Sequence, residues 1–287
     1  MFQLLRPRQW TKNLLLFAAL VFAKKLFDAD AVVLASLGFA AFCLASSSVY
    51  IVNDLLDAER DRLHPDKQNR PIASGAISPG TAAIVAAVLT VASLALAFWV
   101  APAFGIAAVL YVGLTHFYSL AGKNVVILDV LLIAFGFVIR AIAGALAIAV
   151  PISDWFILCM AFLALFLAVS KRKSELVTLK EEAVNTRPVL ERYTETSLNT
   201  YTAVTMAATL ICYGLYVFDF QKQAGTDSQL LILTLPVAVF GVFRYHHLAE
   251  TTGMGDKPEE VLLRDRPIQL SATAFALVAV AALYLGV

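Results

Sequence analysis

Nine apolar segments run along this chain and leave little sequence from which a soluble domain could fold. Each is long enough, or nearly so, to cross the hydrocarbon core of a bilayer, which takes about 20 helical residues. Hydrophobic residues occupy 60% of the 287 positions and charged residues 15%, a balance typical of polytopic membrane proteins. We therefore predict an all-helical protein with nine transmembrane helices in a single domain over residues 1–287. The predicted spans are residues 10–27, 31–55, 79–100, 103–121, 125–150, 153–170, 197–219, 229–247 and 268–286.

Basic residues are distributed unevenly between the two sides that this topology defines. If the N-terminus is cytoplasmic, eighteen Lys and Arg residues fall on the inner side and only Lys24, Lys25 and Lys222 on the outer side. Lys and Arg favour the cytoplasmic side of a membrane. The sequence thus predicts a multi-pass protein of the inner or plasma membrane, with its N-terminus and active site facing the cytoplasm. No nucleic-acid partner is expected, and a homo-oligomer stays open.

A run of acids ends the second apolar segment. If the helix continues at about 100° per residue, five side chains share one face: Asn53, Asp54, Asp57, Asp61 and His64. Mg²⁺ takes oxygen ligands and binds through a few carboxylates together with substrate phosphates. The pattern favours a magnesium–diphosphate site at the membrane surface, with the three Asp residues as metal ligands and catalytic residues. The alternative is a solvated helix end whose acids pair with Arg60 and Arg62.

Further cations lie near the acids and near the N-terminus. Lys67 and Arg70 belong to a turn bounded by Pro65 and Pro71, and phosphate oxygens that Mg²⁺ leaves uncovered need such donors. Anchoring by the positive-inside rule explains their charge equally well. Arg8 and Lys12 are four residues apart, so on a helix they would present two cations to lipid headgroups or to a substrate phosphate.

Arg140 lies deep in the fifth apolar segment, eleven residues after Asp129 and nearly on the same helical face. A charged Arg at such a depth is costly and by default indicates a cavity or a partner. A structural ion pair or a carbonyl contact is the alternative. Tyr118 and Lys123, which end the preceding segment on the inner side, are further candidates for substrate binding.

Lys171 and Arg172 end the sixth apolar segment, where they are either topology determinants or phosphate ligands. Glu175 follows one turn later and would orient an Arg or a sugar hydroxyl. Arg264 and Arg266 lie in a mixed-charge loop before the last span, a pattern typical of solvated loops, and they rank second. The sequence contains no Walker loop, Gly-rich dinucleotide motif or Gly-x-Ser-x-Gly motif, so nucleotide hydrolysis and serine hydrolase chemistry have no support.

These motifs resemble the UbiA superfamily of intramembrane prenyltransferases. The first motif of that superfamily is Asn-Asp-x-x-Asp-x-x-x-Asp, at the cytosolic end of the second of nine helices. Residues 53, 54, 57 and 61 match it at every position. Members that use a prenyl diphosphate typically carry a second motif, Asp-x-x-x-Asp, after the sixth helix. Here residues 170–175, Ser-Lys-Arg-Lys-Ser-Glu, take its place.

That basic segment, together with residues 6–10, 140–144 and 258–266, resembles the decaprenyl-phosphate phosphoribosyltransferase branch of the superfamily. The resemblance implies Mg²⁺ as cofactor, phosphoribosyl pyrophosphate as donor and a long polyprenyl phosphate as acceptor. It also implies a role in making arabinose precursors for mycobacterial-type cell walls. Asn53 and His64 would support the metal or bind sugar hydroxyls. The proposed phosphate ligands are Lys67, Arg70, Lys123, Lys171 and Arg172, followed by Arg8, Lys12 and Arg140.

Chemistry favours the same assignment. A lipid phosphate is already anionic and attacks the anomeric carbon without a dedicated base, so the departure of diphosphate is the step that needs help. Two other functions stay open. A prenyltransferase acting on an aromatic or other small acceptor shares the first motif but is expected to carry a second acidic cluster. A transporter usually places ionisable groups near the bilayer midplane, whereas here only Arg140 lies clearly away from one boundary.

Overall fold

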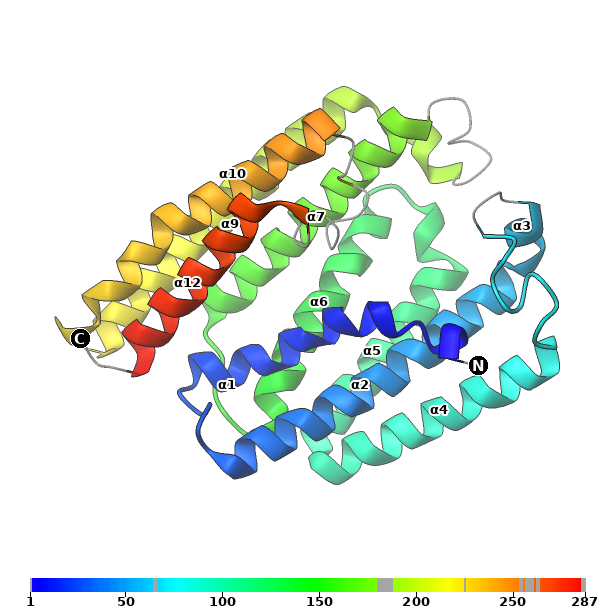
Figure 1. Cartoon of the computed structure of the whole chain (residues 1–287), viewed down its shortest axis with the longest axis horizontal. Helices are drawn as coiled ribbons and strands as arrows, with labels where there is room; N and C mark the ends of the chain where they lie inside the picture. The colour runs from blue at the N-terminus through cyan, green and yellow to red at the C-terminus, as the bar shows by residue number, and fades with distance from the viewer. Residues whose placement is uncertain are drawn as a thin grey trace. The chain divides into compact units, whose positions relative to one another are not determined.

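The computed structural model describes residues 2–63, 67–179, 188–224, 226–252, 255, 261 and 264–284. Within these ranges every regular element is a helix (Figure 1). The chain divides into two compact units. Unit 1 comprises Met1–Gly122 and Gly136–Pro151, and unit 2 comprises Lys123–Phe135 and Ile152–Val287. The prediction of a single domain stays a prediction.

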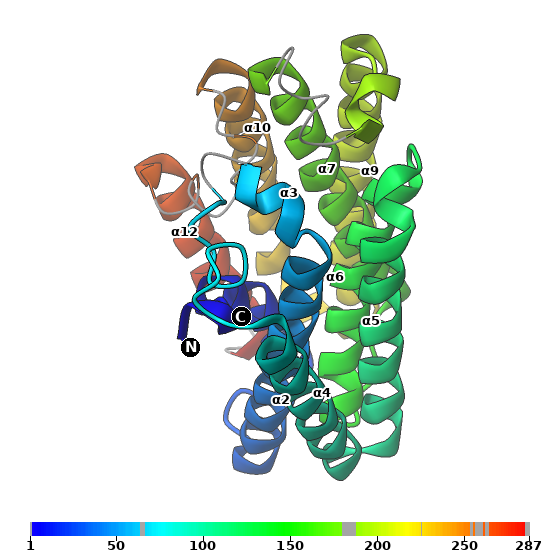
Figure 2. The ribbon, with the colours of Figure 1, turned by 90° about the vertical axis from the view of Figure 1, so that its right-hand side faces the viewer.

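Unit 1 is built around one long central helix, α2. Its elements are η1 (Phe2–Leu5), η2 (Pro7–Phe17), α1 (Ala18–Phe22), α2 (Ala29–Leu56), α3 (Ala58–Leu63), α4 (Pro79–Val100), α5 (Pro102–Leu120) and the second part of α6 (Leu128–Ala147). The central helix packs against η2, α4 and α5. Figures 1 and 2 both show α4 running alongside α2.

Local sequence determines where the long helices of unit 1 begin. The side chain of Asp28 accepts a hydrogen bond from Ala31 N at 3.2 Å and caps α2. Ser78 caps α4 in the same way, through Thr81 N at 3.2 Å. Such caps satisfy backbone donors that have no partner within the helix. Pro102, at the first turn of α5, suits a helix start because its missing N–H is not needed there.

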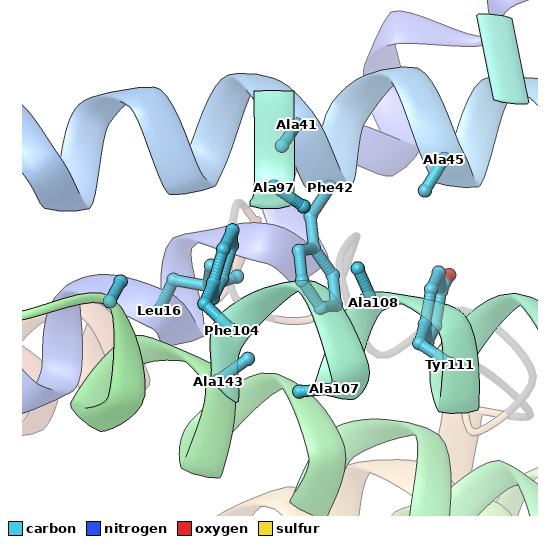
Figure 3. Close-up of a cluster of buried hydrophobic side chains, with 11 residues drawn as sticks. Leu16, Ala41, Phe42, Ala45, Ala97, Phe104, Ala107, Ala108, Tyr111 and Ala143 are labelled. Carbon is cyan, nitrogen blue, oxygen red and sulfur yellow. The ribbon is translucent and has the colours of Figure 1, made fainter. Parts of the chain in front are cut away.

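Aromatic rings and small residues hold α2 against α5 and α6. Figure 3 shows Phe42 of α2 pointing toward α5, where its ring centroid lies 5.5 Å from that of Phe104 and 5.1 Å from that of Tyr111. Leu16 and alanines fill the rest of this cluster, and the small alanines let the helices approach closely. The backbones also approach closely at Gly144 of α6, where an added Cβ would lie 2.2 Å from the backbone oxygen of Leu16. The 3₁₀ helix η2 therefore lies directly on α6.

Unit 2 contains two main pairs of packed helices. Its elements are the first part of α6, α7 (Asp154–Leu179), η5 (Pro188–Arg192), α9 (Glu195–Ala224), η6 (Thr226–Leu233), α10 (Thr234–Thr252) and α12 (Arg266–Tyr284). A further short helix, η3 (Gly122–Asn124), lies where the two units meet along the sequence. In unit 2, α7 packs along α9 and α10 packs along α12. An edge-on contact of Phe166 with Tyr245, at 5.6 Å between ring centroids, joins α7 to α10.

Eight helices of the described residues are long and apolar enough to cross a membrane. They correspond to eight of the nine predicted spans, and α7 continues beyond the predicted end at residue 170 to Leu179. The predicted span at 10–27 differs, because η2 and α1 contribute eleven and five residues there instead of one α-helix. At rises of 2.0 and 1.5 Å per residue they extend about 30 Å. The count of nine spans is therefore approximate.

Candidate active site

The Asp-rich motif bends at its centre and does not continue as one straight helix. The central helix α2 ends at Leu56, Asp57 has φ −97° and ψ 5°, and α3 begins at Ala58. Hydrogen bonds from Asp57 N to Asn53 O (3.0 Å) and from Asp61 N to Asp57 O (2.9 Å) carry the backbone through the bend. As a result α3 points in a different direction from α2 (Figures 1 and 2).

Asp54 and Asp61 meet at one guanidinium group. Arg70 Nη1 donates to Asp54 Oδ1 at 3.1 Å and to Asp61 Oδ2 at 2.6 Å. Arg6 Nη2 donates to the same Asp54 oxygen at 2.5 Å, and its guanidinium lies 5.2 Å from the ring centroid of Tyr50. The two acids are 3% and 4% exposed, whereas the arginine side chains are 23% and 27% exposed. Two cations that reach solvent therefore cover two buried carboxylates.

The turn after α3 places Arg70 over these acids. Ile72 is buried in an apolar cluster with residues of α2 and α4 and anchors the turn. Gly75 has a φ of 78°, which Gly adopts without steric cost. Arg62 Nε donates to Ala73 O at 3.1 Å, so this arginine supports the turn. At Asp54 and Asp61 the pairing cations are Arg6 and Arg70, whereas the alternative reading of the sequence named Arg60 and Arg62.

Asp54 and Asp61, here called the acid cluster, carry oxygen atoms that suit a hard divalent cation. Oxygens of Asp54 and Asp61 already converge on one positively charged nitrogen, and carboxylate oxygens are the ligands that Mg²⁺ prefers. Among the residues that the structure describes, no three His, Cys, Asp or Glu side chains are grouped so that they could hold a metal ion alone. The cluster therefore fits a cation that shares its coordination with substrate phosphates, provided that Arg70 moves away.

Arg140 forms a second polar network inside unit 1. Its Nε donates to Asn13 Oδ1 (2.8 Å), its Nη1 to Gly136 O (3.0 Å) and its Nη2 to Tyr111 Oη (2.7 Å). The side chain is 6% exposed. Its acceptors are neutral oxygens. One of them is the backbone carbonyl of Gly136, and a carbonyl contact was one of the alternatives considered for Arg140 from the sequence. Arg140 and Asp129, predicted to share a helical face, thus belong to different networks.

In unit 2 Arg172 is enclosed by carboxylates. Its Nε donates to Asp129 Oδ2 at 2.7 Å and its Nη1 to Glu175 Oε2 at 2.6 Å. The hydroxyl of Tyr193 donates to Asp129 Oδ1 at 2.6 Å and accepts from Ile127 N at 2.7 Å. Burial and the bond to Asp129 raise the pKa of Tyr193, so this side chain stays a neutral hydroxyl. The guanidinium of Arg172 is 1% exposed and is an internal part of unit 2.

The other predicted site residues differ in their burial. Lys173, next to Arg172, pairs with Glu250 of α10. Half-buried side chains are those of Asn53, Asp57, Lys12, Lys67, Tyr118, Lys123 and Lys171. Exposed side chains are those of Arg8, Arg264 and Arg266. His64 lies outside the described residues.

Five members of the networks are not among the residues that the sequence selects as site candidates: Arg6, Asn13, Tyr111, Asp129 and Tyr193. Two of them carry a usable signal. Arg6 is one more cation in the basic N-terminal segment. Asp129 is an acid inside an apolar span, and the argument that a charge in such a span is costly, which selects Arg140, applies to it as well. The other three are ordinary polar residues whose partners lie far away in the sequence.

Comparison with known families places this helical membrane protein among the membrane-bound transferases. The model of the UbiA prenyltransferase family matches residues 14–253, and the chain is a member of this family.

Within the family, the chain is similar to decaprenyl-phosphate phosphoribosyltransferases. It is 36% identical to the one from Mycolicibacterium smegmatis, over 97% of this chain and 91% of the relative. It is 35% identical to the one from Mycobacterium tuberculosis, over 98% of this chain and 93% of the relative. A UbiA homologue from Archaeoglobus fulgidus, solved with DMAPP and Mg²⁺, shares the fold with a TM-score of 0.72 at 20% identity, over 98% of this chain and 97% of that one.

Proposed function

We propose that this chain transfers the 5-phosphoribosyl group of phosphoribosyl pyrophosphate to a polyprenyl phosphate such as decaprenyl phosphate, and releases diphosphate. The curated relatives that bear the name of this activity support the proposal, since they match over nearly the whole chain. The observation that carries the choice of donor lies in α7. Where users of prenyl diphosphates typically hold a second acid pair, this chain holds Arg172, buried between Asp129 and Glu175.

The proposed reaction forms one bond and breaks one. An oxygen of the lipid phosphate attacks C1 of the ribose, and the bond from C1 to diphosphate breaks with its electron pair staying on the diphosphate. The nucleophile is already ionised, so no side chain has to remove a proton. The remaining difficulty is the negative charge on the leaving diphosphate, which fixed positive groups stabilise strongly in a site that excludes water.

The acid cluster of unit 1 is the proposed diphosphate site. A bound Mg²⁺, held by Asp54, Asp57 and Asp61, would neutralise negative charge on the leaving diphosphate. Arg6 and Arg70 already contact Asp54 and would donate to phosphate oxygens, a task for which the planar guanidinium is well suited.

The other site residues receive proposed roles according to their burial. Arg140 and Arg172 are enclosed by protein partners, so we assign them as positioning residues rather than direct phosphate ligands. Arg140 would fix the N-terminal segment through Asn13, and Arg172 would fix Glu175. Direct contact with phosphates or sugar hydroxyls is proposed for Asn53, His64, Lys67, Tyr118, Lys123, Lys171 and Glu175, and in second rank for Arg8, Lys12, Arg264 and Arg266.

Purified protein given phosphoribosyl pyrophosphate, Mg²⁺ and decaprenyl phosphate is expected to form a phosphoribosyl lipid and one equivalent of diphosphate. Mass spectrometry of the lipid and an enzymatic diphosphate assay measure the two products. A parallel reaction with a prenyl diphosphate and 4-hydroxybenzoate tests the prenyltransferase alternative. Absence of the phosphoribosyl lipid would contradict the proposal, and a prenylated benzoate in its place would establish the alternative.

A further inference from the structure

The acid cluster contains a cation of its own, which competes with any other cation for the same oxygens. One nitrogen of Arg70 lies within 3.1 Å of oxygens from both Asp54 and Asp61. Arg6 adds a second charged hydrogen bond to the same oxygen of Asp54. A carboxylate oxygen has about two lone-pair sites for such bonds. Both sites of Asp54 Oδ1 are taken, so a metal ion that binds this oxygen must displace a guanidinium group.

The charges of the cluster favour a metal ion that arrives together with an anion. The carboxylates of Asp54 and Asp61 and the guanidinium groups of Arg6 and Arg70 together carry no net charge. A divalent cation alone would make the cluster positive and would leave Arg6 and Arg70 without acceptors beside it, which is unfavourable in a partly buried place. A cation that carries diphosphate brings phosphate oxygens, which are strong acceptors for the displaced guanidinium groups.

The surroundings of the two arginines allow this exchange. Both side chains are partly exposed, whereas the acids that they cover are buried. Arg70 belongs to a turn whose buried anchor is Ile72, two residues further on, so its side chain is able to change partners while the turn keeps its place. Arg6 stands between the short helices η1 and η2.

We propose that Arg6 and Arg70 are exchangeable counterions. They neutralise Asp54 and Asp61 when substrate is absent, and they bind the diphosphate oxygens when metal and donor enter together. The inference rests on the proposed function and adds that the metal and the diphosphate bind as one unit. Divalent cations without diphosphate then bind weakly, because the displaced arginines gain no new hydrogen-bond acceptors.

Binding of Mn²⁺ to detergent-purified protein tests this directly, with the free ion measured by electron paramagnetic resonance. In the unsubstituted protein, inorganic pyrophosphate is expected to tighten Mn²⁺ binding by about tenfold or more. In Arg70→Gln, Mn²⁺ alone is expected to bind about tenfold more tightly than in the unsubstituted protein, and the effect of pyrophosphate is expected to shrink. Arg70→Lys, which keeps the charge without the planar guanidinium, is expected to lie between the two.

Arg60→Gln is the matched control, because it removes an exposed Arg from the same segment and is expected to leave both affinities unchanged. If Arg70→Gln does not fold, Arg6→Gln applies the same test at Asp54. The inference is overturned if removal of either arginine leaves the affinity for Mn²⁺ alone unchanged or lowers it. It is also overturned if pyrophosphate has no effect on the unsubstituted protein. Failure of the proposed function is a separate result, namely the absence of phosphoribosyl lipid in the transfer assay.

Discussion

Charged side chains inside this protein are surrounded by specific partners. Asp54 is buried beneath two arginines, Arg172 lies between two carboxylates, and Arg140 is held by neutral oxygens. Removing one member of such a group leaves the other charge uncompensated, which usually costs more than the pair contributes in net terms. Substitutions that preserve shape and alter only charge or one hydrogen bond are therefore the most informative at the residue scale.

Asp54→Asn is expected to lower phosphoribosyl transfer by at least about a hundredfold, because the charge proposed to hold the metal and the two arginines is lost. Steady-state transfer rates measure this. The variant keeps the shape of the side chain and is expected to remain folded in size-exclusion chromatography. Asp30→Asn, exposed near the start of the same helix, is the control expected to retain full activity. Normal turnover by Asp54→Asn would contradict the proposed metal site.

Because of Tyr193, the stability of unit 2 is expected to fall at alkaline pH. Its pKa is raised above the ordinary value of 10.0 by burial and by the bond to Asp129, so folding favours the neutral hydroxyl. This contribution is fully present below pH 10.0 and is lost as the pH rises further. Tyr193→Phe is expected to lower the free energy of unfolding by about 1–2 kcal/mol at neutral pH and to reduce the alkaline loss.

Chemical unfolding at several pH values measures both effects of the Tyr193 substitution. Tyr201→Phe, which removes the hydroxyl of a half-buried tyrosine packed against the same apolar cluster, is the control. Identical alkaline profiles for the unsubstituted protein and Tyr193→Phe would show that the hydroxyl of Tyr193 does not contribute.

The sequence predicted part of this chemistry because the Asp-rich motif can be recognised without tertiary information. Asp54 and Asp61 were expected on one face of a continuing helix; both contact Arg70, but across a bend at Asp57 that the sequence did not predict. The contacts of Arg6 with Asp54 and of Arg140 with Asn13 join residues 48 and 127 positions apart. A single sequence does not specify which distant segments pack together, so these pairs could not be predicted. The roles of the site residues in catalysis stay predictions.

At the scale of elements, the unusual feature is η2. It is an eleven-residue 3₁₀ helix, although such helices rarely exceed four residues. Side-chain contacts hold it in place: Asn13 donates to Ser46 of α2 at 3.2 Å and accepts from Arg140 of α6. Tertiary contacts thus override the ordinary preference for an α-helix. This is why the first apolar segment differs from its prediction.

Gly144→Ala is expected to loosen η2 from α6, because the added methyl group would lie 2.2 Å from the backbone oxygen of Leu16 and backbone cannot yield as a flexible side chain does. We expect a loss of about 1–3 kcal/mol in stability, seen as a lower thermal unfolding midpoint. Gly113→Ala in α5 has no atom within 4 Å of its new methyl group and is expected to be neutral or slightly stabilising. Equal midpoints for the two variants would contradict the close packing of η2.

At the scale of the whole molecule, composition and segment length were sufficient to predict an all-helical membrane protein. Apolar runs of the length needed to cross a bilayer are readable without knowledge of tertiary contacts. The ends of the spans were less accurate where polar residues extend a helix, as in α7, which runs through Arg172 to Leu179. The orientation follows from the distribution of Lys and Arg and is a proposal.

That orientation is tested by cysteine labelling in intact cells. Lys222→Cys is expected to react with a membrane-impermeant maleimide, whereas Ser74→Cys, in the turn beside Arg70, is expected to react only after permeabilisation. Both positions are exposed. The native Cys43, Cys159 and Cys212 are buried, so the unsubstituted protein serves as the background control. The reverse labelling pattern would place the acid cluster on the outer side.

The bend at Asp57 has a consequence for which ions the acid cluster accepts. Along a straight α-helix, seven residues advance about 10 Å, which would hold the carboxyl groups of Asp54 and Asp61 apart by two turns. Here both groups reach a single nitrogen atom. The angle between α2 and α3 therefore sets the width of the gap between the two acids. A substitution that straightened the backbone at this point would widen the gap, and so alter ion selectivity, without replacing either Asp54 or Asp61.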